Sequence, residues 1–278
     1  MNRSLLKGFT RCKTAPGFTL IELIITIAVL GVLAAAVLIA INPAQKIAAA
    51  RLATIEAFDA TIKHSLIFDL VGEWTFDDAG AGTAKDTSGY GNHATSVTAT
   101  SALDRKGQAN KAYSFNGTNI TVPDNVSLKP TSAITISAWI KPNNTLRGGI
   151  VDTFSGGFRG YDMFVLNGRS YFYLAISGNS NDQSFQGIVT GVWQLITWSY
   201  DGASEKGYLN GTQMISAAKS GTILYDTTPL KIGLENYWLN NFNGSIDDVR
   251  IYKSALLSSQ IKQLYAQGLI KHLLAFKY

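Results

Sequence analysis

The sequence is poor in the residue types that build covalent cross-links and metal centres. It contains one cysteine, Cys12, so the chain beyond its basic N-terminal stretch has no thiol for a disulfide or a cysteine-ligated metal. The three histidines fall in an expected helix, a turn and the C-terminal tail, and they predict neither a catalytic triad nor a zinc cluster: His64, His93 and His272. An exported domain of this size can rely on its hydrophobic core instead.

Motifs of catalysis are also missing. The sequence has no Gly-x-Ser-x-Gly, no P-loop and no His-Glu-x-x-His. Glycoside hydrolysis needs two carboxylates on one face, and no Glu-x-Asp-x-x-Glu occurs, although Glu73 and Asp77 share a strand face. Adjacent acidic residues occur only at Asp77-Asp78 and Asp247-Asp248. We therefore expect a protein that is not an enzyme.

A long apolar run extends from Phe18 to Ile41 and is interrupted only by Thr19, Glu22 and Thr26. At a rise of about 1.5 Å per residue, such a helix reaches roughly 36 Å and can cross a bilayer core of about 30 Å. Residues 1–17 carry basic side chains and no acid, which holds them in the cytoplasm and sends the rest of the chain outward. The sequence predicts a membrane-anchored protein with an extracytoplasmic head.

The run from Gly17 through Phe18 and Glu22 to Leu23 resembles the N-terminus of type IV pilins and of pilin-like secretion subunits. This resemblance implies cleavage between Gly17 and Phe18 by a prepilin peptidase, methylation of the new amino terminus, and assembly with other pilin-like subunits. A neighbouring subunit's terminal amine would then pair with Glu22, since a lone carboxylate in hydrocarbon is costly. The alternatives are an ordinary secretory signal cut near Ala36, an uncleaved anchor, and a Glu22 that snorkels to the interface.

Cleavage would change the charge balance of the chain. The full sequence has 24 Lys+Arg against 19 Asp+Glu, a net charge of +5. Removing the leader cations Arg3, Lys7, Arg11 and Lys13 leaves 24 − 4 = 20 against 19, a net charge of +1. The basic character therefore belongs to the leader and does not predict nucleic-acid binding.

The helical pattern resumes after a break at Asn42-Pro43. Apolar residues recur at mostly three- and four-residue steps from Ile47 to Leu66, with charged residues between them. This pattern predicts a rod-like extension of the membrane helix, whose apolar stripe packs on the head or on neighbouring subunits.

From Gly72 to Tyr252 the chain is a series of short β-rich runs divided by Gly, Asn and Asp. Ile134–Lys141 alternates cleanly, with Ile134, Ile136, Ala138 and Ile140 on one face, and Asn-Gly pairs such as Asn210-Gly211 mark tight turns. We expect roughly a dozen strands in a two-sheet antiparallel sandwich.

Successive blocks of this region resemble a laminin G-like (concanavalin A-like lectin/glucanase) jelly roll. These blocks are Trp74–Asp77, Asp86–Asn92, Tyr113–Gly117, Ile134–Pro142, Trp193–Gly202, Tyr208–Gly211 and Phe242–Tyr252, followed by a helix-like Ser254–Tyr265. The expected class is α+β, with a long transmembrane helix, an all-β jelly roll and a short C-terminal helix. The expected segments are a leader (1–17), a membrane helix (18–41), its extension (42–69), the jelly roll (70–267) and a tail (268–278).

A structural calcium ion is one candidate ligand of the head, because many jelly rolls of this kind hold calcium at the rim. Calcium prefers carboxylate, amide and carbonyl oxygens, and the loop from Asp86 to Asn92 supplies them on a glycine-bent backbone. Asp247 could approach this loop if the first and last strands pair. In the alternative interpretation, Asp86 only caps its own turn.

A glycan or another surface ligand is the second candidate, since exposed aromatic faces stack on sugar rings. Tyr237 and Trp238 lie among polar residues in one loop, and Tyr161 belongs to a second aromatic cluster that starts at Phe158. The alternative is simple packing at the rim of the sandwich. Trp74, Trp139, Trp193 and Trp198 fall in expected strands and are assigned to the core.

These features predict a pilin-like subunit that displays a laminin G-like head for adhesion or ligand binding. One alternative is a pseudopilin of a type II-like secretion system whose head contacts cargo. Another is a pilus-displayed enzyme that acts on polysaccharides, which the missing carboxylate pattern disfavours. The chain would be found at the cell surface or in a pilus or pseudopilus.

The leader motif gives the first testable prediction. We expect a mature N-terminus at Phe18, because Gly17 ends a basic leader directly before the apolar run. N-terminal mass spectrometry of the membrane-extracted protein measures this. A chain that starts after Ala36, or that keeps Met1, would contradict the pilin interpretation.

Overall fold

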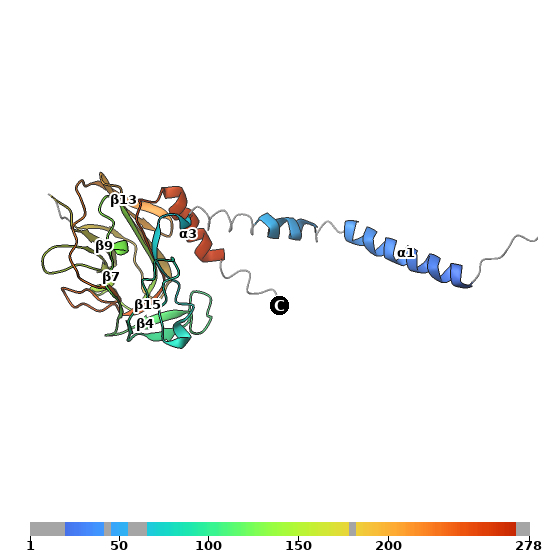
Figure 1. Ribbon diagram of the computed structural model, residues 1–278, viewed down its shortest axis with the longest axis horizontal. Helices are drawn as coiled ribbons and strands as arrows, with labels where there is room; N and C mark the ends of the chain where they lie inside the picture. Colours follow the sequence, from blue (N-terminus) through green and yellow to red (C-terminus); the bar gives the residue numbers. More distant parts are fainter. Residues whose placement is uncertain (1–19, 42–45, 55–65, 178–181, 271–278) are drawn as a thin grey trace, which may run out of the picture. The chain divides into compact units, whose positions relative to one another are not determined.

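The computed structural model describes residues 20–41, 46–54, 66–177 and 182–270, with the backbone alone over 32–41 and at 270 (Figure 1). The chain forms two compact units, Met1–Phe58 and Asp59–Tyr278, and each is described here by itself. Gly17 and Phe18, at the expected cleavage site, lie outside the described residues, as do 271–278 of the expected tail.

The first unit is helical. Helix α1 spans Leu20–Ile41, and a second helical stretch covers residues 46–54. Glu22 lies in the first turn of α1, where the helix dipole favours a negative charge. The Thr26 hydroxyl donates to the Glu22 carbonyl oxygen at 2.6 Å. Among the described residues, no helix combines the length and the hydropathy required to cross a bilayer.

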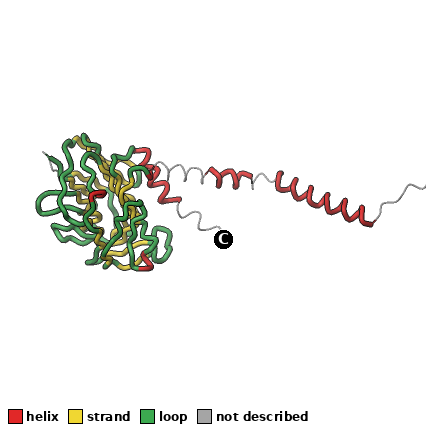
Figure 2. The backbone as a smooth tube through the Cα atoms, in the orientation of Figure 1, coloured by secondary structure: helices red, strands yellow, loops and turns green. Residues whose placement is uncertain are grey.

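The second unit is a sandwich of two antiparallel sheets (Figures 1 and 2). The strands of the eight-stranded sheet are β1 (Leu70–Trp74), β3 (Thr100–Ala102), β4 (Ala112–Phe115), β6 (Ile134–Pro142), β11 (Gln194–Tyr200), β12 (Ser204–Leu209), β13 (Thr212–Ala218) and β15 (Gly244–Tyr252). Their order is β13-β12-β11-β6-β15-β4-β3, and β1 pairs with β15 beside this path.

The opposite sheet has seven strands. They are β2 (Ser96–Val97), β5 (Ile120–Val122), β7 (Gly148–Asp152), β8 (Tyr161–Leu166), β9 (Arg169–Leu174), β10 (Gln183–Gln186) and β14 (Leu230–Ile232). Their order is β10-β9-β8-β7-β14-β5-β2. Together with α1 and the C-terminal helix α3 (Ser258–Ile270), this arrangement confirms the predicted fold class.

The main core lies between the two sheets. In β6 the alternation seen in the sequence places Ile134, Ile136, Ala138 and Ile140 in this core, each fully buried. Trp198 of β11 stacks on Phe172 of the opposite sheet with ring centroids 5.7 Å apart. The buried Trp198 indole donates to the Ser170 hydroxyl at 2.9 Å, which satisfies its one polar atom.

A second apolar cluster covers the outer face of the eight-stranded sheet. Helix α3 buries Ile261 and Leu264 there against Leu195, Tyr208 and Trp139 of the sheet. Tyr265 stacks on Trp139 with ring centroids 5.6 Å apart. The central strands of this sheet are therefore covered on both faces, which agrees with the core assignment of Trp74, Trp139 and Trp198; Trp193 is half-buried next to the start of β11.

The outer face of the seven-stranded sheet is covered differently. Along β8, Tyr161, Met163 and Val165 point into the core, so Asp162 and Phe164 point outward. The loops that follow β7 and β14 contribute further side chains to this outer face, and the candidate site is built there.

Docking of α3 can be tested with a matched pair of leucines. We expect Leu264→Ala to lower the free energy of unfolding by about 2–5 kcal/mol, because a buried leucine is replaced by a cavity. Leu257→Ala, at a residue that is 67% exposed next to the same helix, should change it by less than about 0.5 kcal/mol. Chemical denaturation of the full chain measures both. Equal losses would contradict the packing of α3 on the sheet.

Candidate ligand-binding site

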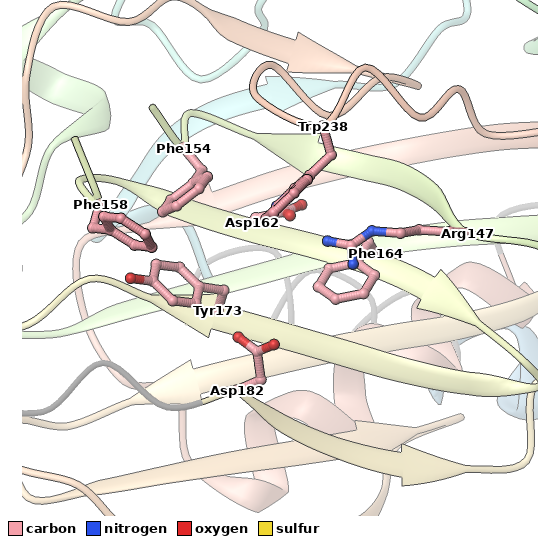
Figure 3. Close-up of a pocket in the computed structure, with 8 residues that line it drawn as sticks. All are labelled: Arg147, Phe154, Phe158, Asp162, Phe164, Tyr173, Asp182 and Trp238. Carbon is pink, nitrogen blue, oxygen red and sulfur yellow. The ribbon is translucent and has the colours of Figure 1, made fainter. Parts of the chain in front are cut away.

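A pocket of about 280 Å³ lies on the outer face of the seven-stranded sheet (Figure 3). Strands β8 and β9 form its floor, and its other side chains come from the segments before β7 and β10 and from the loops after β7 and β14. Its lining residues are Arg147, Phe154, Phe158, Asp162, Phe164, Tyr173, Asp182 and Trp238.

Aromatic rings form most of the pocket wall. Phe154 makes edge contacts with Phe158, Tyr173 and Tyr237, with ring centroids 5.8, 4.6 and 5.9 Å apart. Tyr237 in turn makes an edge contact with Trp238 at 4.8 Å. Phe154 is buried, whereas Phe158 and Trp238 are 60% and 53% exposed; the buried ring contacts Phe158 directly and Trp238 through Tyr237.

The two aromatic loops are held in tight conformations. In the first loop, Phe158 has φ 54° and Gly160 has φ 98°. A Cβ at Gly160 would lie 2.4 Å from the Thr153 carbonyl oxygen, so only glycine fits this turn. In the second loop, backbone hydrogen bonds from Glu235 to Asn240 and from Leu239 to Glu235 close the turn that presents Trp238. These restraints position both exposed rings before a ligand arrives.

An ion pair between Arg147 and Glu235 ties the second loop to the sheet. Arg147 Nε and Nη2 donate to the fully buried Glu235 carboxylate at 2.7–3.0 Å. The guanidinium lies 4.3 Å from the Phe164 ring centroid and 5.2 Å from that of Trp238. Burial alone would lower the pKa of Arg147, but pairing with Glu235 outweighs it and raises the pKa.

Further carboxyl groups lie beneath and beside the pocket. Burial raises the pKa of Asp152 to about 8, although its oxygens accept backbone N–H groups of Phe154 and Asn236. Burial also raises the pKa of Asp162, and the nearby carboxyls of Asp152 and Glu235 raise it further. A carboxyl oxygen accepts hydrogen bonds, so Asp162 at the pocket wall can bind hydroxyl-bearing ligands.

The structure brings together some predicted site residues and separates others. Trp238 lines the pocket and Tyr237 supports it from behind. The expectation for Tyr161 is wrong, because this ring is fully buried in the inter-sheet core and its hydroxyl donates to the Leu128 carbonyl oxygen at 3.3 Å. Phe158, from the same sequence cluster, faces the pocket instead.

Sequence reasoning missed the polar half of the site. Arg147 and Glu235 are 88 residues apart in the chain, and the pair becomes visible only in the folded sheet. Asp162 could have been noticed as an acidic residue at an outward position of an otherwise apolar strand. No local signal marked Asp182, which contacts the pocket from before β10.

The proposed calcium ligands are engaged in other interactions. Asp86 accepts hydrogen bonds from the backbone N–H groups of Glu73, Ser88 and Asn92 and from the Ser88 hydroxyl, at 2.8–2.9 Å. The Asn92 amide donates to the Val71 carbonyl at 2.8 Å, and Asp247 pairs with Arg105 at 2.6 Å. Within the described residues, no group of three or more His, Cys, Asp or Glu side chains is arranged to hold a metal.

Comparison with known families agrees with this architecture. Residues 114–262 match the concanavalin A-like lectin/glucanases superfamily, and because the match covers more than half of the 278 residues, the chain belongs to this superfamily. Residues 13–38 match the prokaryotic N-terminal methylation motif. The predicted fusion of a pilin-type N-terminus and a laminin G-like domain is thus confirmed, and the N-terminal match is typical of membrane-anchored pilin-like surface proteins.

Two individual proteins that resemble this chain in sequence or structure are each less than 30% identical to it. Over 145 residues, or 48% of this chain, the sequence is 29% identical to adhesion G-protein coupled receptor V1 of Danio rerio, of which it spans 2%. The binding domain of Paraclostridial Mosquitocidal Protein 1 has a TM-score of 0.61 and 20% identity, covering 72% of this chain and 52% of that one.

A smaller solved domain is matched over nearly its whole length. Domain 4 of AbnA, an extracellular arabinanase from Geobacillus stearothermophilus solved with arabinotriose, has a TM-score of 0.57 and 24% identity. The match covers 71% of this chain and 98% of that domain. At these identities the solved structures show the fold alone.

The calcium prediction can be separated from turn capping by thermal melting. If a calcium ion is bound near Asp86, a chelator should lower the Tm of the full chain, and added calcium should restore it by mass action. Asp86→Asn keeps the side-chain shape and should remove this response. A Tm that is indifferent to chelator and calcium would leave Asp86 as a turn cap, in agreement with its hydrogen bonds.

Proposed function

We propose that this protein is a pilin-like subunit whose extracytoplasmic head binds glycans and thereby mediates adhesion. The observation that carries the proposal is the convergence of two aromatic loops on one pocket. Phe158 and Trp238 are 80 positions apart in sequence, yet both line this pocket (Figure 3). The chain's membership of the concanavalin A-like lectin/glucanases superfamily supports a binding role.

The chemistry of the pocket suits a sugar. Ring faces stack on the apolar faces of pyranose or furanose rings, and carboxyl groups exchange hydrogen bonds with hydroxyls. Trp238 and Phe158 supply such rings at the mouth, and Asp162 and Asp182 supply carboxyl groups. One solved domain with this fold was determined in complex with arabinotriose, which is consistent with a saccharide ligand for this chain.

Binding is favoured over catalysis by the partners of the acidic groups. Glu235 is held by two guanidinium nitrogens of Arg147, and Asp152 is held by backbone N–H groups. A glycosidase needs two carboxyl groups that both reach the scissile bond. Release of reducing sugar from a bound polysaccharide would favour the alternative, an enzyme displayed on a pilus.

A secretion pseudopilin is the other candidate, since the pilin-type N-terminus serves both kinds of machine. In that case the pocket would contact exported cargo. Deleting the protein separates the two functions: loss of attachment with normal secretion supports adhesion, and loss of secretion supports the pseudopilin.

The pocket gives a direct prediction about Trp238. We expect Trp238→Ala to abolish glycan binding with little change in Tm, because the ring is 53% exposed and lies at the pocket mouth. Leu239→Ala is the matched control: Leu239 is in the same loop and is 68% exposed, but it is not among the pocket-lining residues. Glycan-array screening of the detergent-solubilised full chain identifies the ligand, and titration compares the variants. Unchanged binding by Trp238→Ala would place the site elsewhere.

Assembly into a fibre gives a prediction about Glu22. The carboxylate lies in the first turn of α1, next to the amino terminus that cleavage would create. Opposite charges attract strongly where the effective dielectric constant is low, so a neighbouring subunit's amine would set the register between rods. We expect Glu22→Gln to be cleaved and inserted but to enter fibres poorly, with Glu22→Asp milder. Normal incorporation of Glu22→Gln into isolated fibres would contradict an assembly role.

A further inference from the structure

The side chains around the pocket include more acidic groups than basic ones. Arg147 is neutralised by its bidentate pair with Glu235. Asp162 and Asp182 also line the pocket, and Asp152 lies beneath it. Near these groups, Lys219 forms a buried ion pair with Glu205 at 2.8 Å. The groups left over after pairing are therefore carboxyls, which disfavours an anionic ligand.

One oxygen of Asp162 lacks a donor. The side chain is 2% exposed, and its Oδ1 receives no hydrogen bond from the described residues. A buried acceptor left in this state costs free energy, which a donor on a ligand would recover. Asp162 lines the pocket beside Trp238, so a molecule bound in the pocket would lie next to this carboxyl group (Figure 3).

The rings around the pocket already hold one cation. The Arg147 guanidinium lies over Phe164 and within 5.2 Å of the Trp238 ring centroid, the geometry of a cation–π contact. Tyr173, Phe154 and Phe158 line the remaining wall and offer further ring surface. An aromatic box with acidic groups at its floor is the environment in which proteins bind ammonium groups.

We propose that this pocket selects saccharides that carry a positively charged amino group over their neutral or acetylated counterparts. The inference rests on the proposed glycan-binding function and names its ligand class. The amino group would lie against the Trp238 and Tyr173 rings and donate to Asp162, with Asp182 at the opposite side. The sugar ring would stack on the exposed aromatic rings at the mouth.

Binding of a cation should be coupled to proton release. Burial raises the pKa of Asp162, and a neighbouring positive charge favours the ionised form of a carboxyl, so a bound cation should lower that pKa. The affinity for a permanent cation should therefore rise as the pH rises and level off above the pKa of the empty site. The charged or titratable groups that act on the pocket carboxyls are Asp152, Glu235, Arg147, Asp182 and Lys219.

The test uses two matched pairs of probes on the detergent-solubilised full chain. A glucosamine trisaccharide is compared with its fully N-acetylated form, and choline is compared with 3,3-dimethyl-1-butanol, its neutral isostere. Titration calorimetry at several pH values gives each Kd. We expect each cationic probe to bind at least about tenfold tighter than its partner, and choline affinity to increase with pH.

Variants assign the effect to the carboxyl groups. Asp162→Asn keeps the side-chain shape, and we expect it to remove the preference for cations and the pH dependence. Asp182→Asn removes the second carboxyl group of the pocket and tests whether it also contributes to the preference for cations. Because Asp182 is exposed, this change should not affect folding. Asp77→Asn, at an exposed carboxylate that is not among the pocket-lining residues, is the control and should change nothing.

The outcomes distinguish this inference from the proposed function. Equal or tighter binding of the acetylated trisaccharide, with choline no better than its isostere, would overturn the preference for amino groups and leave glycan binding intact. Binding of choline without binding of any saccharide would support the cation site and overturn the glycan function. If no probe binds, both are overturned.

Discussion

The site depends on the ion pair between Arg147 and Glu235. Glu235 is fully buried, and an uncompensated carboxylate there would be strongly destabilising. The bidentate contact at 2.7–3.0 Å compensates that charge and fastens the loop that carries Trp238 to the start of β7. Removing Arg147 would leave the Glu235 charge buried without this partner, and removing either residue would break the link between the loop and β7. The position of the Trp238 loop in the pocket therefore depends on this ion pair.

Close backbone packing makes that pair possible. A Cβ at Gly149 would lie 2.4 Å from the Glu235 backbone nitrogen, and one at Gly148 would lie 2.7 Å from the Phe242 Cα. The two glycines let the loop after β14 lie directly against β7. The two outer faces of the sandwich differ: helix α3 packs apolar residues on part of one, beside buried ion pairs, and the other carries loops, charges and exposed rings around the pocket.

Much of the chain could be predicted because its signals are local. The cleavage motif and the apolar run each occupy one continuous stretch of sequence, as does the alternation of Ile134–Lys141. Trp238 was predicted to bind a ligand because an aromatic side chain among polar loop residues is unusual. This signal is visible in the sequence without knowing where the loop lies in the fold. The prediction that Tyr161 binds the ligand was wrong, because the local sequence does not show which way its side chain points. Gly160 marks a turn, yet β8 begins at Tyr161, and the pleat directs its first side chain into the core.

By itself, then, the sequence determined the pilin-type N-terminus, the two-sheet sandwich and one wall of the pocket, because periodicity and short motifs are properties of neighbouring residues. The tertiary structure decided which charged groups meet. Arg147, Asp162 and Glu235 come from three segments and share one site only after β7 and β8 pair and the loop after β14 folds onto β7. The pKa shifts of Arg147 and Asp162 arise from burial and from the proximity of other charged groups, and neither condition exists before the sheet forms.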